Sequence, residues 1–136
     1  KHALAYTPGA GAAGGLGFAF IAIGATIKSG AKLVAETIGL EEEIMKADIV
    51  ITGEGKSDHQ TMSGKAPSYV AKLARKYGVP VLLISGTIAE AHNELKFFFT
   101  EIHEIKPKKM ELKRAIKEAE MLLWNKTKEV LIKASF

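Results

Sequence analysis

The residues best suited to chemistry lie together in one stretch, GEGKSDHQTMSGKAP, at residues 53–67. Its two carboxylates, Glu54 and Asp58, are groups that can bind Mg²⁺ or accept a proton from a substrate hydroxyl. Its two lysines, Lys56 and Lys65, can neutralise an anion, and its glycines allow the backbone to approach an anion closely. We therefore interpret this stretch as a candidate site for an anionic substrate.

The elements around this stretch indicate where it lies in the fold. Residues 48–52 and 80–85 read DIVIT and PVLLIS, which are typical of buried strands, and residues 65–77 between them have the apolar spacing of a helix. Strands that are apolar on both faces and separated by a helix are typical of a parallel sheet covered by helices. Ligands bind beyond the carboxyl ends of such strands. Residues 53–64 are therefore predicted to form a loop at that ligand-binding edge.

The remaining pattern extends this arrangement over most of the chain. From residue 48 onward the predicted order is strand, loop, helix, strand, helix, strand, helix, with a weaker strand at 101–105 and a long amphipathic helix at 110–133. Before it, we predict a buried helix at 16–23, a helix with one apolar face at 30–38, and a short helical turn at 41–46. The sequence thus predicts an α/β fold with a parallel sheet flanked by helices.

Composition narrows the classes of function. The chain has 136 residues, no cysteine and a formal net charge of +4 at pH 7. This length suffices for one compact domain, and the mild basic excess suits an anionic small molecule but falls short of a nucleic-acid-binding surface. Without cysteine, disulfides and thiolate chemistry are excluded. The most apolar run, residues 16–27, is too short and too interrupted by glycine for a transmembrane helix, so we expect a cytoplasmic protein with no membrane or nucleic-acid partner.

Two phosphate-binding motifs fit only in part. Residues 55–57 match the end of a Walker A loop, but Val50 stands where that motif requires its first glycine. Residues 9–14 match G-x-G-x-x-G, yet Thr7 and Pro8 precede them in place of a clear strand. What remains is a glycine-rich turn that opens onto a helix and can present backbone N–H groups to phosphate. An equal alternative is that these glycines and alanines allow close helix packing.

Other notable residues have simpler interpretations. The four histidines lack metal-ligand spacing, and only His59, inside the charged stretch, suggests a function. The basic cluster at residues 106–114 is interpreted as a solvated helix face. Trp124 and the phenylalanines at 97–99 are predicted to lie in the core.

Three segments of the sequence resemble a known family. PGAGAAGGLGFAF at residues 8–20, ADIVITGEGKSDHQTMSGKAP at 47–67 and AKLARKYGVPVLLISGT at 71–87 are similar to segments of the class I glycerate kinases, bacterial enzymes that phosphorylate D-glycerate with ATP. The segments occur in the same order across essentially the whole chain. The resemblance implies phosphoryl transfer to the 2-hydroxyl of glycerate, with ATP and Mg²⁺ as cofactors.

The same resemblance implies that the fold is incomplete here. In the family, the N-terminal and C-terminal parts of a longer chain build a Rossmann-like or flavodoxin-like domain, and a second α/β domain is inserted between them. Residues 1–40 resemble the end of the inserted domain, and residues 41–136 resemble the C-terminal part of the Rossmann-like domain. The family's N-terminal segment, with its Asp-Ser-Phe-Lys-Gly type motif, is not matched. We therefore expect a complementing N-terminal segment or a homo-oligomer as partner.

Individual site residues follow from the central segment. The family's usual sequence in this segment is closer to GEGRIDxQT. Relative to it, Lys56 replaces an arginine and Ser57 replaces an apolar residue. We predict Asp58, Glu54 and Lys56 as catalytic residues. Asp58 would orient or deprotonate the glycerate hydroxyl or hold Mg²⁺, and Glu54 would assist with the metal. The predicted substrate- and phosphate-binding residues are Gly11, Gly14, Gly15, Gly53, Gly55, Gln60, Thr61 and Lys65.

Two alternatives remain open from the sequence. One is a non-catalytic remnant that binds an anion or pairs with a separate N-terminal polypeptide. The other is a different phosphate-binding α/β protein that uses the same loop. An exposed apolar surface, with self-association or instability of the isolated chain, would distinguish the remnant from an intact enzyme.

Overall fold

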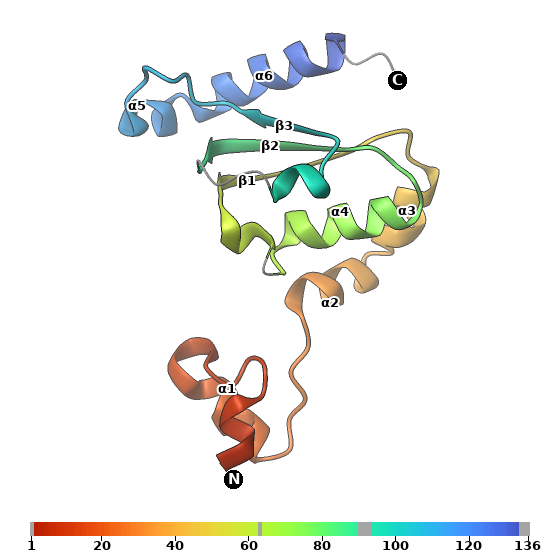
Figure 1. Ribbon diagram of the computed structural model, residues 1–136, viewed down its shortest axis with the longest axis vertical. Coiled ribbons are helices and arrows are strands. Elements are labelled where there is room, and N and C mark those ends of the chain that lie inside the picture. The colour runs from red at the N-terminus through yellow and green to blue at the C-terminus, as the bar shows by residue number, and fades with distance from the viewer. Residues whose placement is uncertain (1, 63, 90–93, 134–136) are drawn as a thin grey trace.

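The computed structural model describes residues 2–62, 64–89 and 94–133, and Figure 1 shows their arrangement. Three parallel strands form one sheet in the order β1-β2-β3: Val50–Ser57, Val81–Ile88 and Glu101–Glu104. The α-helices are α1 (Ala12–Ala22), α2 (Gly30–Thr37), α3 (Leu40–Lys46), α4 (Ala66–Lys76), α5 (Leu112–Lys117) and α6 (Ala119–Lys133), and the 3₁₀ turns are η1 (His2–Tyr6), η2 (His59–Met62) and η3 (Leu95–Phe97). The predicted α/β fold, a parallel sheet flanked by helices, is confirmed.

The central strand explains the continuous apolar run of PVLLIS. Val50 pairs with Val81 and Ser57 with Ile88, while Leu82 on the other side pairs with Glu101. Helices α3 and α4 lie on one face of the sheet, and α5 and α6 lie on the other (Figure 1). Because both faces of β2 are covered, its first five residues are all buried.

The main core lies between α4 and the sheet. Ala71 and Ala74 of α4 are fully buried, and their small side chains allow the helix to approach Val81 and Leu83 of β2 closely. The boundaries of α4 follow from the sequence, because Pro67 occupies its first turn and Gly78, with a φ of +71°, follows its end. This helix confirms the one predicted at residues 65–77.

The first strand is longer than predicted. We expected it to end at Thr52 and to be followed by a loop, but β1 continues to Ser57 because it pairs with the equally long β2. Two glycines allow this pairing. A Cβ on Gly53 would lie 2.3 Å from the carbonyl oxygen of Ile84, and a Cβ on Gly86 would lie 2.3 Å from that of Gly55. The loop prediction for residues 53–57 was therefore wrong.

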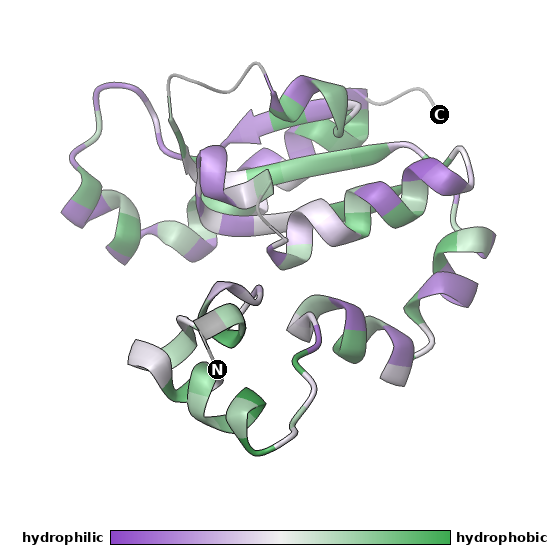
Figure 2. Ribbon diagram, turned by 60° about the horizontal axis from the view of Figure 1, so that its bottom comes forward, coloured by the Kyte–Doolittle hydropathy of each residue, from purple (hydrophilic) through white to green (hydrophobic). Residues whose placement is uncertain are grey.

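The helix predicted at residues 16–23 forms but is not buried. Helix α1 has no buried residue, and Ile23 beyond its end is 80% exposed. Figures 1 and 2 show this largely hydrophobic helix apart from the sheet, where it packs against η1. Burial requires a second apolar layer, and the rest of the described chain does not place one over α1 in either view.

The C-terminal part differs from prediction in two ways. The helix expected at 110–133 is divided into α5 and α6, which meet at Glu118, a residue with non-helical backbone angles. Between β2 and β3 the described residues contain the 3₁₀ turn η3 where an α-helix was expected, and residues 90–93 of that connection lie outside the described part. Ala115 and Val130 are the buried residues of α5 and α6.

Two predictions of core aromatics were also wrong. Trp124 is 70% exposed on α6, and Phe97 is exposed, whereas Phe99 is buried as predicted. The helix predicted at 30–38 is confirmed as α2, with the Ser29 side chain accepting a hydrogen bond from the backbone N–H of Lys32. None of the helices in the described ranges has the length and hydrophobicity needed to cross a membrane.

Candidate functional site

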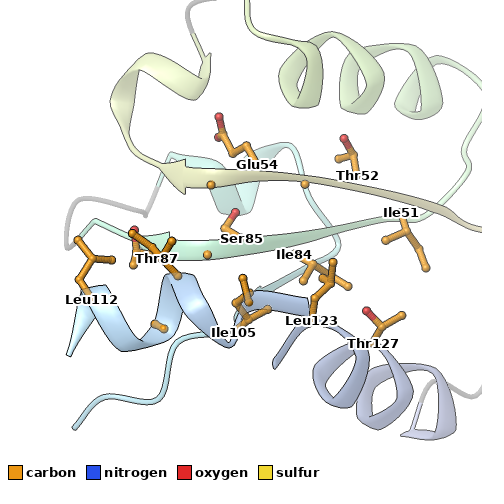
Figure 3. Close-up of a pocket in the computed structure, with 16 residues that line it drawn as sticks. Ile51, Thr52, Glu54, Ile84, Ser85, Thr87, Ile105, Leu112, Leu123 and Thr127 are labelled. Carbon is orange, nitrogen blue, oxygen red and sulfur yellow. The ribbon is translucent and has the colours of Figure 1, made fainter. Parts of the chain in front are cut away.

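A polar cluster forms where β1 ends and η2 turns the chain back toward α4. Side chains alternate along a strand, so Thr52 and Glu54 point to the α4 face while Ile51 points to the opposite face (Figure 3). Glu54 lies opposite Ser85 of β2 in the register. Because η2 follows directly, it brings the buried Thr61 back beside Glu54.

The carboxylate of Glu54 is at the centre of this cluster, and its side chain is only 15% exposed. Two hydroxyls donate to its Oε1, that of Ser57 at 2.9 Å and that of Thr61 at 2.5 Å. The Ser57 hydroxyl is in turn 2.5 Å from the hydroxyl of Ser85 on the neighbouring strand. The other carboxylate oxygen, Oε2, faces the ammonium of Lys65 at 3.7 Å.

Asp58 occupies the turn that follows β1. The backbone N–H of Gln60 donates to its Oδ1 at 2.9 Å, and the ammonium of Lys56 lies 3.8 Å from its Oδ2. The Gln60 hydrogen bond lowers the pKa of Asp58 below its ordinary value. Partial burial opposes this shift, and the positive charges of Lys65 and Lys56 add to it. Asp58 is therefore a carboxylate at neutral pH, and the positive charges of Lys56 and Lys65 stabilise its negative charge.

The structure brings most of the predicted site residues together. Glu54, Lys56, Asp58 and Lys65 are joined by ion pairs and hydrogen bonds, with Gln60 and Thr61 in the adjoining turn. Gly53 and Gly55 both lie near the end of β1, but only Gly53 is packed closely against the backbone of β2. A Cβ on Gly55 would meet no atom within 4 Å, so close strand packing does not require a glycine there.

The N-terminal glycines are not part of this cluster. Gly11, Gly14 and Gly15 lie at the start of α1, which stands apart from the sheet in Figures 1 and 2. A Cβ at any of the three would meet no atom within 4 Å, which does not fit the packing interpretation for them. Gly17 does fit it, because a Cβ there would lie 2.1 Å from the carbonyl oxygen of Gly9. The phosphate-binding interpretation of Gly11, Gly14 and Gly15 stays a prediction.

Two features of the site were missed in the sequence. Ser85 contributes a buried hydroxyl to the cluster, and the sequence signal for it was a serine at the end of the apolar run PVLLIS. On the opposite face of the sheet lies an apolar groove of about 570 Å³ between the strands and the C-terminal helices (Figure 3). Its lining includes Ile51, Ile84, Ile105, Leu112, Ile116 and Leu123.

The cluster is compatible with a magnesium ion. The described residues contain no group of three or more histidine, cysteine, aspartate or glutamate side chains that could hold a metal. Mg²⁺ usually needs fewer, because one or two carboxylates suffice when substrate phosphates and water complete its octahedron. The donor set of Glu54 and Asp58 is of this kind.

Comparison with known proteins shows the family to which the chain belongs. The model of the glycerate kinase family matches residues 1–134 of the chain. The chain belongs to the glycerate kinase family. The resemblance found in the sequence is thus confirmed over nearly its whole length.

Relatives of the glycerate kinase family match this chain at different lengths. The chain is 37% identical to a glycerate kinase from Halalkalibacterium halodurans over 135 residues, which cover 98% of this chain and 36% of the relative. It is 49% identical to a glycerate 2-kinase from Escherichia coli over 84 residues, or 61% of this chain and 22% of the relative.

A solved structure supports the fold. A putative glycerate kinase 2 from Salmonella typhimurium LT2 superposes with a TM-score of 0.54 at 32% identity, covering 89% of this chain and 32% of that one. The chain therefore spans about a third of the length of this structure and of the Halalkalibacterium halodurans relative.

Proposed function

We propose that this chain supplies the strand-end cluster of a glycerate kinase, which transfers a phosphoryl group from ATP to the 2-hydroxyl of D-glycerate. The observation that carries the proposal is the pairing of two carboxylates, Glu54 and Asp58, with two lysines at the end of β1. Relatives named glycerate kinase and glycerate 2-kinase support both the substrate and the product. A cytoplasmic location, expected from the sequence, belongs to the same proposal.

The cluster has the parts that phosphoryl transfer needs. The reaction depends mainly on positioning the reactants and on neutralising charge on the transferred group. The glycerate oxygen forms a bond to the γ-phosphorus, the bond to the β-phosphate oxygen breaks, and the hydroxyl proton leaves to Asp58 or to water. Lys56 and Lys65 would meet the substrate carboxylate or the phosphates. A Mg²⁺ ion held by Glu54 and Asp58 would neutralise phosphate charge.

The surroundings of Asp58 favour one of its predicted roles. A general base works best with a pKa near the operating pH, whereas the pKa of Asp58 is lowered. We therefore assign Asp58 to orienting the hydroxyl or holding Mg²⁺ rather than to early proton removal. Thr61 is fully buried and already bonded, so we assign it to supporting Glu54. Gly53, Gly55 and Gln60 remain candidates for contact with the substrate or phosphates.

Helix α1 supports a partner that completes the site, because this apolar helix has no buried residue. Tyr6 before it and Ile23 after it are at least 80% exposed, and Trp124 and Ile132 on α6, in another part of the molecule (Figure 1), are at least 70% exposed. An apolar helix left exposed in this way is typical of a contact with another polypeptide. We propose that an N-terminal complementing segment or a second copy of the chain covers some of these residues. The alternative, a non-catalytic remnant, predicts the same surface but no turnover.

The test is ADP formation from Mg-ATP with and without D-glycerate. It is measured for the chain alone and for a chimera in which the chain replaces the matching 135 residues of the Halalkalibacterium halodurans relative. Turnover by the chain alone would show that its residues suffice. Turnover by the chimera alone would show that they complete a shared site. Absence of glycerate-dependent turnover in both would favour the remnant. Phosphorus NMR of the product would identify 2-phosphoglycerate.

A matched pair of variants tests the cluster within the active form. Asp58→Asn keeps the size of the side chain and removes its charge, and we expect kcat to fall by about 100-fold or more. Asp48→Asn, an exposed carboxylate just before β1, is the control and should change kcat less than about twofold. A kcat within a few-fold of the unmodified protein for Asp58→Asn would reject its role.

A further inference from the structure

Two chains of hydrogen bonds end on the same oxygen of Glu54, and the direction of the first follows from counting protons. A serine hydroxyl has one proton to donate. Ser57 donates this proton to Oε1 of Glu54 at 2.9 Å. The 2.5 Å contact between the hydroxyls of Ser57 and Ser85 must then be donated by Ser85. The first chain therefore runs from Ser85 on β2, through Ser57 on β1, to Glu54.

The second chain has an equally fixed direction. The backbone N–H of Asp58 can only donate, and it points to the hydroxyl oxygen of Thr61 at 3.0 Å. Thr61 passes its own proton to Oε1 of Glu54 at 2.5 Å. Both chains thus fill the acceptor positions of Oε1, while Oε2 faces the ammonium of Lys65 at 3.7 Å. The two oxygens of one carboxylate have different surroundings.

The donors of both chains are held rigidly. Ser57, Ser85 and Thr61 are almost completely buried, and each takes part in the network. A buried hydroxyl destabilises the fold unless it is hydrogen-bonded. Within the described ranges, no buried side-chain nitrogen or oxygen lacks a partner. The packing therefore allows Glu54 little freedom to rotate about its side chain.

We propose that Ser57 is a positioning residue that, with Ser85 and Thr61, fixes Glu54 so that Oε2 is the oxygen presented to Mg²⁺. The inference rests on the proposed function, because it specifies how Glu54 meets the metal of that reaction. In this proposal, a divalent cation takes the place of the Lys65 ammonium beside Oε2 of Glu54.

The hydrogen bond from Ser57 to Glu54 can be tested without an activity assay. The test is a double-mutant cycle of Ser57→Ala and Glu54→Ala, measured by urea unfolding of the 136-residue chain. We expect the two changes to be non-additive by about tenfold in the folded-to-unfolded ratio, as for one hydrogen bond to a charged group. Thr100→Val is the control. Its hydroxyl accepts from the backbone N–H of Val81 at the far end of β2, so its cycle with Glu54→Ala should be additive within about twofold.

The positioning role is tested by the Mg²⁺ dependence of glycerate phosphorylation in the chimera. Loss of the Ser57 hydrogen bond should raise the half-saturating Mg²⁺ concentration by about tenfold, with kcat at saturating Mg²⁺ changed less than about threefold. Ser85→Ala should have a smaller effect in the same direction, because Ser57 still donates to Glu54. Thr100→Val should leave the Mg²⁺ dependence unchanged.

The outcomes separate this inference from the proposed function. An additive cycle, or an unchanged Mg²⁺ dependence of Ser57→Ala in an active chimera, would overturn the positioning role. A chimera without glycerate-dependent turnover would reject the proposed function and the Mg²⁺ part of this inference with it. Coupling in the unfolding cycle would still support the fixed orientation of Glu54 in that case.

Discussion

Replacement of Gly53 by alanine should separate β1 from β2. The added Cβ would lie 2.3 Å from the carbonyl oxygen of Ile84, whereas a carbon and an oxygen normally approach to about 3.3 Å. The backbones must therefore move apart by about 1 Å at this point. The oxygen belongs to the backbone of the central strand, so it cannot turn away as a flexible side chain would.

The loss in free energy of unfolding for Gly53→Ala is the sum of two contributions, weakened strand hydrogen bonds and steric strain. One or two strand hydrogen bonds are weakened at about 0.5–1.5 kcal/mol each. Strain from the added atom contributes about 1–3 kcal/mol. The free energy of unfolding should thus fall by about 1.5–6 kcal/mol. With a urea m-value of about 2 kcal/mol/M, this lowers the urea midpoint by about 0.8–3 M.

The assay is urea unfolding followed by circular dichroism, with Gly55→Ala as the matched control. Gly55 is two residues further along the same strand, and a Cβ there would meet no atom within 4 Å. Its replacement should change the free energy of unfolding by less than about 0.5 kcal/mol. Gly86→Ala should resemble Gly53→Ala, because its Cβ would lie 2.3 Å from the Gly55 carbonyl oxygen. Equal midpoints for Gly53→Ala and Gly55→Ala would refute the close approach of the two strands.

Three further predictions concern the core and the charges of the cluster. Leu83→Ala removes a fully buried side chain and should lower the free energy of unfolding by about 2–5 kcal/mol in urea titrations, and Leu123→Ala, a half-exposed site, should have a smaller effect. Carbon NMR titration should place the pKa of the Asp58 carboxyl below its ordinary 3.8. Because this pKa is lowered on folding, Asp58 stabilises the fold above its unfolded pKa, and that contribution disappears as the pH falls through the folded pKa. Lys65→Met should raise the pKa of Asp58 in the same titration, whereas Lys46→Met should not.

The elements with strong local patterns were predictable from sequence. The apolar run of β2 and the helical spacing of α4 reflect burial that the sequence itself encodes. Both elements form where predicted, although β2 continues three residues beyond the predicted end, to Ile88. The resemblance at residues 47–67 is long and specific enough to identify the family from the amino-acid sequence alone. These signals are local, so they do not depend on how distant segments meet.

What could not be predicted depends on contacts between segments. The sequence GEGKS has little intrinsic preference for a strand, and residues 53–57 become one because β2 offers a pairing partner of the same length. Ser85 enters the site only through that register, which places it opposite Glu54. Helix α1 is apolar enough for a core, but its burial depends on a layer that the described chain does not place over it.

In the proposed function, a bound divalent cation would explain how the cluster can serve an anionic substrate although its charges balance. Two carboxylates and two lysines sum to zero, so phosphates or a carboxylate would not be attracted by net charge alone. Both ion pairs are loose, at 3.7 Å for Lys65 with Glu54 and 3.8 Å for Lys56 with Asp58. In the proposed function, a divalent cation that binds the carboxylates would release both ammonium groups toward the substrate. Metal binding and anion binding would then be coupled, and the rigid hold on Glu54 would set the position where this exchange takes place.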